Sequence, residues 1–225
     1  MTRLIDFILA SLMLIVLLPL FVLVAFVLKF TGEGEIFYRQ KRIGRYGKPF
    51  EVLKFATMLK NSPYMGTGTV TVNNDPRVLP FGRILRKTKV NEMPQLFNVL
   101  IGQMSFIGPR PLTGENFSFY SDNVKKCIIE ERPGLSGVGS IIFRNEEFIL
   151  ENSNRAKHVY EHLIAPYKGE LELWFVENKS VFLYFKLCVL TVAVIFYPRC
   201  ANLLMRSANF PQASDELKKI LGYGF

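Results

Sequence analysis

The longest apolar stretch of the chain runs from Phe7 to Leu28 and contains no charged residue. As a helix, its 22 residues would extend about 33 Å, which is enough to cross the hydrocarbon core of a bilayer. Pro19 lies within the stretch and favours a kink, because proline removes one backbone hydrogen bond of the helix. The pattern therefore predicts a membrane helix that is broken near Pro19.

Basic residues flank this stretch on both sides. Arg3 precedes it, and the cations that follow are Lys29, Arg39, Lys41, Arg42, Arg45 and Lys48. Lys and Arg near a membrane segment favour the cytoplasmic side, so both ends are drawn to the same face. A re-entrant helix satisfies both ends, and an ordinary spanning helix stays open as the alternative. A cleaved signal peptide is disfavoured, because the stretch is longer than a usual signal and lacks a small-residue cleavage pattern.

The remaining residues alternate short apolar segments with polar turns. Their number fits one domain, so we expect a membrane anchor at residues 1–30 and a cytoplasmic, membrane-associated domain at 31–225. Residues 36–55 contain two apolar segments around glycines and a proline, which predicts a β-hairpin. Residues 61–76 are rich in Gly, Asn, Ser, Thr and Pro, which predicts a long surface loop.

A second apolar segment, Val181–Tyr197, is interrupted by Lys186. Its uncharged part is too short to span a bilayer comfortably. Together with Arg199 and Arg206 it is compatible with a core helix, or with a helix that lies in the membrane interface with its cations toward the lipid head groups. A second spanning helix is the less favoured alternative.

Two short helices are predicted between residues 81 and 102. The first, Phe81–Thr88, has an apolar face and a cationic face. The second begins at Asn91, a good N-cap residue, and ends near Gly102. Its apolar residues recur at the helical spacing i, i+3, i+4 and i+7: Met93, Leu96, Phe97 and Leu100. The expected fold class is therefore α+β, a mainly helical domain with a small β-hairpin or sheet and the N-terminal re-entrant helix.

Charge is distributed unevenly around the second of these helices. Glu92 would lie at its positive end, where an ionised carboxylate is favoured and backbone N–H groups could meet a phosphate. The cations that surround Glu92 in the sequence are Arg77, Arg83, Arg86, Lys87, Lys89 and Arg110. With a net charge of +9 for the chain, this excess predicts an anionic partner and a phosphate site. A simple helix start at Glu92 and a solvated basic face are the structural alternatives.

Arg110 lies in the segment Gly108-Pro109-Arg110-Pro111. Each proline fixes its own φ and restricts the residue before it, so the turn is rigid. A guanidinium on a stiff backbone is suited to bidentate contact with phosphate oxygens.

Other signals favour no further chemistry. The three cysteines form no CxxC pair, which indicates neither a disulfide framework nor a zinc finger. His158, Glu161 and His162 match the H-x-x-E-H pattern of a zinc protease, but a short pattern of this kind arises easily by chance on a polar helix. No recognised nucleic-acid-binding motif is present, and we expect no nucleic acid partner.

Taken in order, these motifs resemble the bacterial monotopic phosphoglycosyl transferases, also called polyprenyl-phosphate sugar-1-phosphate transferases. The resemblance covers roughly residues 1 to 145 and rests on Arg3–Asp6, Gln40–Gly44, Lys54–Met58, Asp75–Arg77, Gly82–Arg83, Leu85–Thr88, Asn91–Leu100, Met104–Pro111 and Arg132–Gly137. It implies a membrane enzyme on the cytoplasmic face of the bacterial inner membrane. The implied reaction moves a sugar phosphate from a nucleotide sugar, usually a UDP-sugar, to a polyprenyl phosphate, and so initiates a lipid-linked glycan.

In this family an Asp-Glu pair and Mg²⁺ serve the chemistry, and the Asp attacks the nearer sugar phosphate to give a covalent intermediate. The resemblance implies catalytic roles for Glu92 and Asn91 and metal binding by Glu92 and Asp75. Its implied contacts to phosphate or nucleotide are Arg86, Arg110, Lys54, Arg77 and Arg144.

The chain departs from the family pattern at the decisive position, because Asn91 stands where the nucleophilic Asp is usual. Gln103 also occupies a position that is often acidic. Three explanations stay open: Glu92 is the nucleophile, transfer is direct without a covalent enzyme, or the chain is a weak or inactive relative that acts as a membrane-bound binding or scaffold protein. A longer carboxylate can reach the phosphorus, so we favour Glu92.

Overall fold

The computed structural model describes residues 2–65, 75–144, 146 and 156–221, so most of the loop predicted at 61–76 lies outside the described residues. The chain divides into two compact units. Unit 1 consists of residues 1–41 and 50–103, and unit 2 consists of residues 42–49 and 104–225. The prediction of an anchor followed by one cytoplasmic domain stays a prediction.

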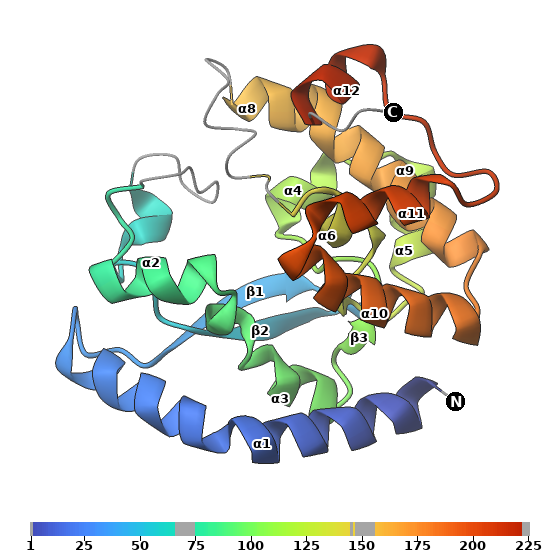
Figure 1. The fold of residues 1–225 in the computed structure, drawn as a ribbon. Coiled ribbons are helices and arrows are strands. Elements are labelled where there is room, and N and C mark those ends of the chain that lie inside the picture. The colour runs from blue at the N-terminus through green and yellow to red at the C-terminus, as the bar shows by residue number, and fades with distance from the viewer. Residues whose placement is uncertain (1, 66–74, 145, 147–155, 222–225) are drawn as a thin grey trace. The chain divides into compact units, whose positions relative to one another are not determined.

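The apolar N-terminal segment forms a single helix, α1 (Thr2–Phe30), which runs through Pro19, so the break predicted there is not found. Figure 1 shows its axis as a curve. By length and composition, α1 is long and apolar enough to cross a membrane. Most of its surface is exposed, and the residues that it buries include Phe21, Val24 and Leu28.

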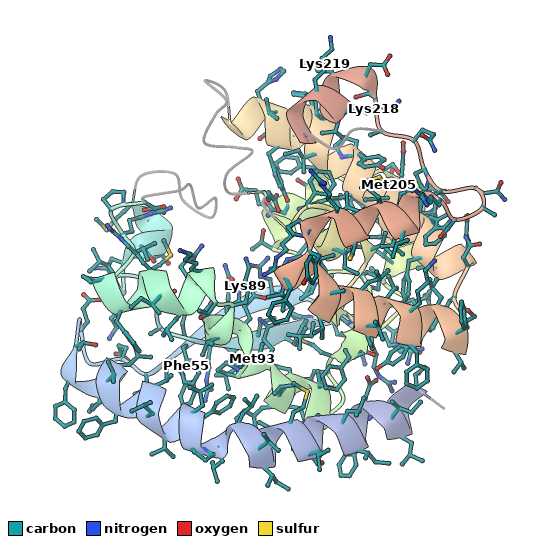
Figure 2. All side chains as sticks on the ribbon, viewed as in Figure 1. Phe55, Lys89, Met93, Met205, Lys218 and Lys219 are labelled. Atoms are coloured by element: carbon teal, nitrogen blue, oxygen red, sulfur yellow. The ribbon has the colours of Figure 1, made fainter. Side chains whose placement is uncertain are left out.

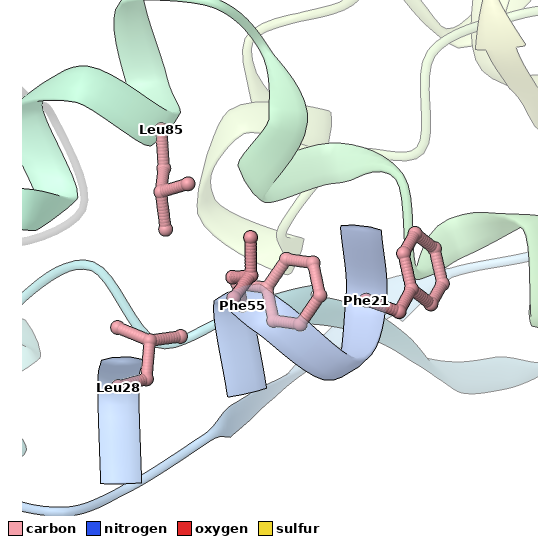
Figure 3. Close-up of a cluster of buried hydrophobic side chains, with 5 residues drawn as sticks. Phe21, Leu28, Phe55 and Leu85 are labelled. Atoms are coloured by element: carbon pink, nitrogen blue, oxygen red, sulfur yellow. The ribbon is translucent and has the colours of Figure 1, made fainter. Parts of the chain in front are cut away.

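These buried residues of α1 belong to the hydrophobic core of unit 1. Phe21 meets Phe55 edge to face, with the ring centroids 5.4 Å apart, and the cluster also contains Val24, Leu28 and Leu85 (Figure 3). The apolar helix is thus packed along one side and leaves its other side without cover in unit 1.

The hairpin predicted at residues 36–55 is confirmed. Strand β1 (Phe37–Ile43) pairs with β2 (Pro49–Phe55) in a two-stranded sheet, and the short 3-10 turn η1 (Arg45–Gly47) joins them. In the turn, Tyr46 and Gly47 both have positive φ angles, 59° and 70°. Residues 37–41 of β1 and 50–55 of β2 belong to unit 1, and the tip of the hairpin, residues 42–49, belongs to unit 2.

After β2, unit 1 contains η2 (Ser62–Tyr64), α2 (Pro80–Lys87), η3 (Val90–Glu92) and α3 (Gln95–Leu100). Helix α2 confirms the predicted amphipathic helix. Asn98 fixes α3 to the hairpin: its Oδ1 accepts from the N–H of Leu53 (3.0 Å) and its Nδ2 donates to the carbonyl of Glu51 (2.7 Å). Arg3 fixes α3 to the start of α1, because its two terminal nitrogens donate to the carbonyls of Val99 and Leu100, both at 2.6 Å.

Unit 2 is built around a parallel pair of short strands, β3 (Ser105–Ile107) and β4 (Gly134–Ser136), with Ser105 opposite Gly134. Its helical elements are α4 (Gly114–Ser118), α5 (Asp122–Ile128), α6 (Val138–Ile142), α8 (Ala156–Val159), the π-helical η4 (Tyr160–Ile164), α9 (Ala165–Glu177), α10 (Val181–Phe196), η5 (Pro198–Ala201), α11 (Asn202–Met205) and α12 (Asp215–Leu221). Helix α9 packs against α5 and α6, and α10 packs against α6 and β3. The α+β fold class is confirmed.

Helix α10 corresponds to the second apolar segment. It buries Leu183, Leu187 and Leu190 in unit 2, as a core helix does. Its other side exposes large apolar side chains such as Phe182 and Val189. The helix therefore combines a core face with an uncovered apolar face, and its contact with lipid stays a prediction.

Candidate active site

The turn that carries Asn91 and Glu92 lies between α2 and α3 in unit 1 (Figure 2, where Lys89 and Met93 are labelled). It begins at Lys89, whose φ of 61° places a non-glycine residue in the left-handed region. Such a conformation costs about 1–2 kcal/mol and is found preferentially at functional sites. The N–H of Glu92 donates to the carbonyl of Lys89 (3.1 Å), and the N–H of Met93 donates to the carbonyl of Val90 (3.1 Å).

The prediction that Asn91 is a helix N-cap is wrong. Asn91 lies inside the 3-10 turn η3, and α3 begins at Gln95 with Pro94 as its N-cap. Four of the amides around Glu92 are already used, because the N–H groups of Glu92, Met93, Leu96 and Phe97 all donate to carbonyls. A phosphate near Glu92 would therefore be bound largely by side chains.

Asn91 itself is buried, with 6% of its surface exposed, and its Oδ1 has no hydrogen-bond partner among the described residues. A buried amide oxygen without a partner costs free energy, so its retention calls for a ligand or a function. Glu92, beside it, is half-buried.

The cationic helix α2 packs against η3. Gly82 allows α2 to approach the preceding segment closely, since a Cβ at this position would lie 2.3 Å from the carbonyl oxygen of Thr57. Arg86 is half-buried at the end of α2, and its Nη1 lies 3.8 Å from Sδ of Met58. The structure thus brings Arg86, Asn91 and Glu92 into one part of unit 1. Lys54 lies on β2 of the same unit, half-buried and next to the core residue Phe55.

Asp75 and Arg77 form a buried ion pair, with 2% and 4% of their surfaces exposed. Nη2 of Arg77 donates to Oδ2 of Asp75 (2.6 Å), and Nε donates to Oδ1 (2.9 Å). Nη1 donates to the carbonyls of Ser62 (2.9 Å) and Met65 (2.8 Å). Hydrogen bonding to Asp75 raises the pKa of Arg77 above its ordinary value. Metal binding by Asp75 and phosphate binding by Arg77 stay predictions, but either ligand would have to compete with this pair.

The two remaining predicted residues, Arg110 and Arg144, belong to unit 2. Arg110 lies in the predicted rigid turn after β3, and its Nη1 donates to Oγ of Ser140 in α6 (3.4 Å). Arg42 braces the same turn, because its Nη1 donates to the carbonyl of Pro111 (3.2 Å). Arg144 follows the end of α6 in the chain, and Arg110 bonds to a residue of the same helix.

The sequence analysis missed Glu172 on α9. It is 2% exposed, and its carboxylate accepts hydrogen bonds from the backbone N–H groups of Arg110 and Gly139. Burial raises the pKa of Glu172 to about 7, although these bonds and the charges of Lys168 and Arg110 act in the opposite direction. A carboxylate between Leu171 and Leu173, directly before the apolar residues Trp174, Phe175 and Val176, was the available signal.

A metal ion can be tested against these residues. Mg²⁺ prefers oxygen ligands and usually takes one or two from the protein, with water and substrate phosphates completing its shell. The orphaned Oδ1 of Asn91 and the carboxylate of Glu92 are donors of this kind. Among the described residues there is no group of three or more His, Cys, Asp or Glu that could hold a metal ion. His158 and His162 lie close together, with their ring centroids 4.3 Å apart, but they do not belong to such a group. The two donors therefore fit a Mg²⁺ ion of the kind that is shared with a phosphate ligand, and Mg²⁺ binding stays a prediction.

Comparison with known proteins identifies the family of the chain. The family model described as "Bacterial sugar transferase" matches residues 1–198. The exopolysaccharide production protein ExoY of Sinorhizobium fredii is 38% identical over 155 residues, which are 63% of this chain and 68% of that protein. The UDP-glucose:undecaprenyl-phosphate glucose-1-phosphate transferase of Klebsiella pneumoniae is 34% identical over 195 residues, 84% of this chain and 39% of the relative.

A third relative is the undecaprenyl-phosphate galactose phosphotransferase of Salmonella typhimurium, 33% identical over 158 residues, which are 64% of this chain and 33% of that protein. The chain therefore spans about two thirds of the first relative and well under half of the other two. The extent of the family match decides the assignment: the chain belongs to the bacterial sugar transferase family and is an enzyme of the sugar-phosphate transferase type.

Proposed function

We propose that this enzyme transfers a sugar-1-phosphate from a nucleotide sugar of the UDP class to undecaprenyl phosphate or a similar polyprenyl phosphate, and thereby initiates a lipid-linked glycan such as an exopolysaccharide. The names of its relatives support this donor, this acceptor and this product class. They give no support to the alternative of an inactive binding or scaffold protein.

The observation that carries the proposal is the Asn91–Glu92 turn. Its left-handed Lys89 holds two adjacent oxygen-bearing side chains next to the cationic helix α2. Because an amide is neutral and not nucleophilic, Glu92 is the member of the pair that can attack a phosphorus atom. Arg86 supplies positive charge from α2, the helix that packs against the Asn91–Glu92 turn. A preorganised cation lowers the barrier to phosphoryl transfer.

The proposed reaction has two displacements. A carboxylate oxygen of Glu92 attacks the phosphorus that bears the sugar, which forms an acyl-phosphate P–O bond and breaks the P–O bond to the departing nucleoside monophosphate. An oxygen of the polyprenyl phosphate then attacks the same phosphorus. The acyl-phosphate bond breaks, the lipid carries the sugar phosphate away, and the Glu92 carboxylate is regenerated.

Glu92 and Asn91 are the residues that would hold Mg²⁺, through a carboxylate oxygen and the orphaned Oδ1. When bound, the ion neutralises charge on the donor phosphates. We propose that Asn91 supplies a neutral oxygen ligand to the ion and helps to fix the position of Glu92.

We also infer that α1 anchors the enzyme in the bacterial cytoplasmic membrane, with unit 1 on the cytoplasmic face. Near the start of α1, Arg3 bonds to the end of α3, and near its other end Leu28 is packed in the core of unit 1. A helix whose two ends are both held by the same folded unit is better suited to enter and leave one face of the bilayer than to cross it. The uncovered residues of α1, such as Ile15, Val16 and Phe26, would then face lipid.

Isotope exchange tests the covalent route. The full chain in detergent or nanodiscs is incubated with a UDP-sugar and labelled UMP in the absence of polyprenyl phosphate. A Glu92 intermediate predicts that label enters the UDP-sugar, and Glu92→Gln should abolish both this exchange and lipid-dependent UMP release. Transfer without exchange would instead indicate direct displacement.

Asn91 provides the matched variants. Asn91→Asp restores an acid at the usual position, and in the Glu92→Gln background it should recover part of the exchange if the two carboxylates are interchangeable. Loss of transfer in Asn91→Ala together with full activity in Glu92→Gln would contradict the assignment of Glu92.

A further inference from the structure

A carboxylate lies buried at the junction of three segments of unit 2. Glu172 projects from α9, and its carboxylate accepts the backbone N–H groups of Arg110, in the turn after β3, and of Gly139, in the first turn of α6. One of its oxygens, Oε2, has no hydrogen-bond partner among the described residues. A single side chain therefore connects the Gly-Pro-Arg-Pro turn with α6.

The local sequence leaves room for this carboxylate. A Cβ on Gly139 would lie 2.8 Å from Oε1 of Glu172, and a Cβ on Gly137 would lie 2.4 Å from the carbonyl oxygen of Gly108. Both glycines permit a close approach that a larger residue would block. The backbone of the turn and the backbone of α6 therefore both lie against the carboxylate of Glu172 on α9.

Burial of this charge is expensive, and stability alone does not account for it. A desolvated carboxylate destabilises the folded state unless it is fully hydrogen-bonded and paired. Among the described residues, Lys168 forms its ion pair with Glu146, because its Nζ donates to Oε2 of that residue (2.6 Å), and its charge acts on Glu172 without a direct ion pair. Residues that lower stability in this way are retained where they serve function.

We propose that Glu172 is a positioning residue that holds Arg110 for contact with the donor phosphates. Its carboxylate fixes the main-chain amide of Arg110, while the Arg110 side chain reaches Ser140 of α6, the helix whose first turn the same carboxylate holds. The position of Arg110 is thus fixed at two points: its main-chain N–H by Glu172 and its guanidinium by Ser140. Preorganisation of this kind lowers the ordering cost of binding a phosphate.

This inference rests on the proposed function, because it takes Arg110 to be a phosphate contact. It gives Glu172 a role that neither the resemblance nor the names of the relatives assigns. Positioning also requires the ionised carboxylate, since protonation weakens its bonds to the two amides. The titratable and charged groups that act on Glu172 are Lys168, Arg110 and Tyr120, and Lys168 is itself paired with Glu146.

The test compares Glu172→Gln with Glu170→Gln, which makes the same charge change at an exposed site on the same helix. Dissociation constants for UDP are measured by equilibrium dialysis with the full-length protein, and kcat and KM for a UDP-sugar are measured from pH 5.5 to 8.5. We expect Glu172→Gln to weaken UDP binding and to raise KM by about 10- to 100-fold, as loss of a supporting contact does. Glu170→Gln should behave as the wild type.

Two readouts separate positioning from a structural role. Wild-type kcat/KM should fall as the pH drops through about 7, where Glu172 takes up its proton, and Glu172→Gln should lack this limb. At pH 8 the melting temperature of Glu172→Gln should equal or exceed that of the wild type, because a buried charge has been removed. Activity and melting temperature that fall together in this variant would overturn the inference.

A double-mutant cycle with Arg110→Ala completes the test. If Glu172 acts through Arg110, then Glu172→Gln should cause no further loss in the Arg110→Ala background, whereas independent, additive losses would overturn the inference. A wild type that binds UDP but turns over no donor would refute the proposed function alone. A wild type that binds no UDP would refute both.

Discussion

Replacement of Asp75 by Asn distinguishes a structural carboxylate from a metal ligand. The change leaves the guanidinium of Arg77 buried, with 4% of its surface exposed, and its Nη1 still donates to the carbonyls of Ser62 and Met65. Removal of one member of a buried ion pair costs about 3–5 kcal/mol, because the other charge is left uncompensated. For a chain of this size the melting temperature should fall by about 6–20 °C.

The assay is thermal unfolding in detergent together with the Mg²⁺ dependence of UMP release. We expect a lower melting temperature and, in the protein that remains folded, an unchanged Mg²⁺ concentration for half-maximal rate. The double variant Asp75→Asn with Arg77→Met removes both charges and should recover most of the lost stability. An unchanged melting temperature with a raised Mg²⁺ requirement in Asp75→Asn would refute this reasoning and assign Asp75 to the metal.

Three further predictions concern packing and backbone strain. Gly82→Ala should destabilise unit 1 by about 3 kcal/mol, measured by thermal unfolding, because the new Cβ would lie 2.3 Å from the carbonyl oxygen of Thr57; a wild-type melting temperature would contradict this. Phe21→Ala should cost about 3–5 kcal/mol through loss of a core ring, whereas Phe26→Ala, at a position that is 64% exposed, should leave stability nearly unchanged and weaken binding to lipid vesicles. Equal effects of the two substitutions would argue against the observed packing of α1. Lys89→Gly should relieve the left-handed strain and stabilise the protein by about 1 kcal/mol, and a loss of stability would show that the Lys89 side chain contributes more than the strain costs.

The elements with a clear periodic pattern were predictable from the sequence. The long apolar run gave α1, the two apolar segments around glycines gave the β1–β2 hairpin, and the amphipathic spacing gave α2. In each of these elements the local preference and the burial pattern point to the same structure, so little competes with it.

The start of α3 was not predictable, because several neighbouring residues carry competing signals. Asn91 is a good N-cap by type, but Pro94 also favours a helix start, and the chain forms a 3-10 turn before the helix begins. The choice between such starts is made by tertiary packing, here by the contact of η3 with α2.

The candidate site was predictable by residue type, but its partnerships were not. Nothing in the sequence indicates that Arg77 is occupied by Asp75 and by the carbonyls of Ser62 and Met65. Glu172 was hidden for the same reason, since its partners lie on a turn and a helix that precede it by at least thirty residues. Hydrogen bonds between distant segments depend on the three-dimensional fold, and local patterns do not encode them.

The tip of the hairpin, residues 42–49, has a consequence for how the chain is made. Its N–H and guanidinium groups bond to the carbonyls of Leu112, Ile129 and Glu130, which are separated from it by up to 85 residues. During synthesis the tip leaves the ribosome well before these partners, so unit 2 is completed only when a much later segment reaches it. A cut between residues 103 and 104 would not divide the chain into two folding modules, because the second fragment would lack its earliest part. Fragments intended to refold together should therefore carry residues 42–49 on the same piece as residues 104–225.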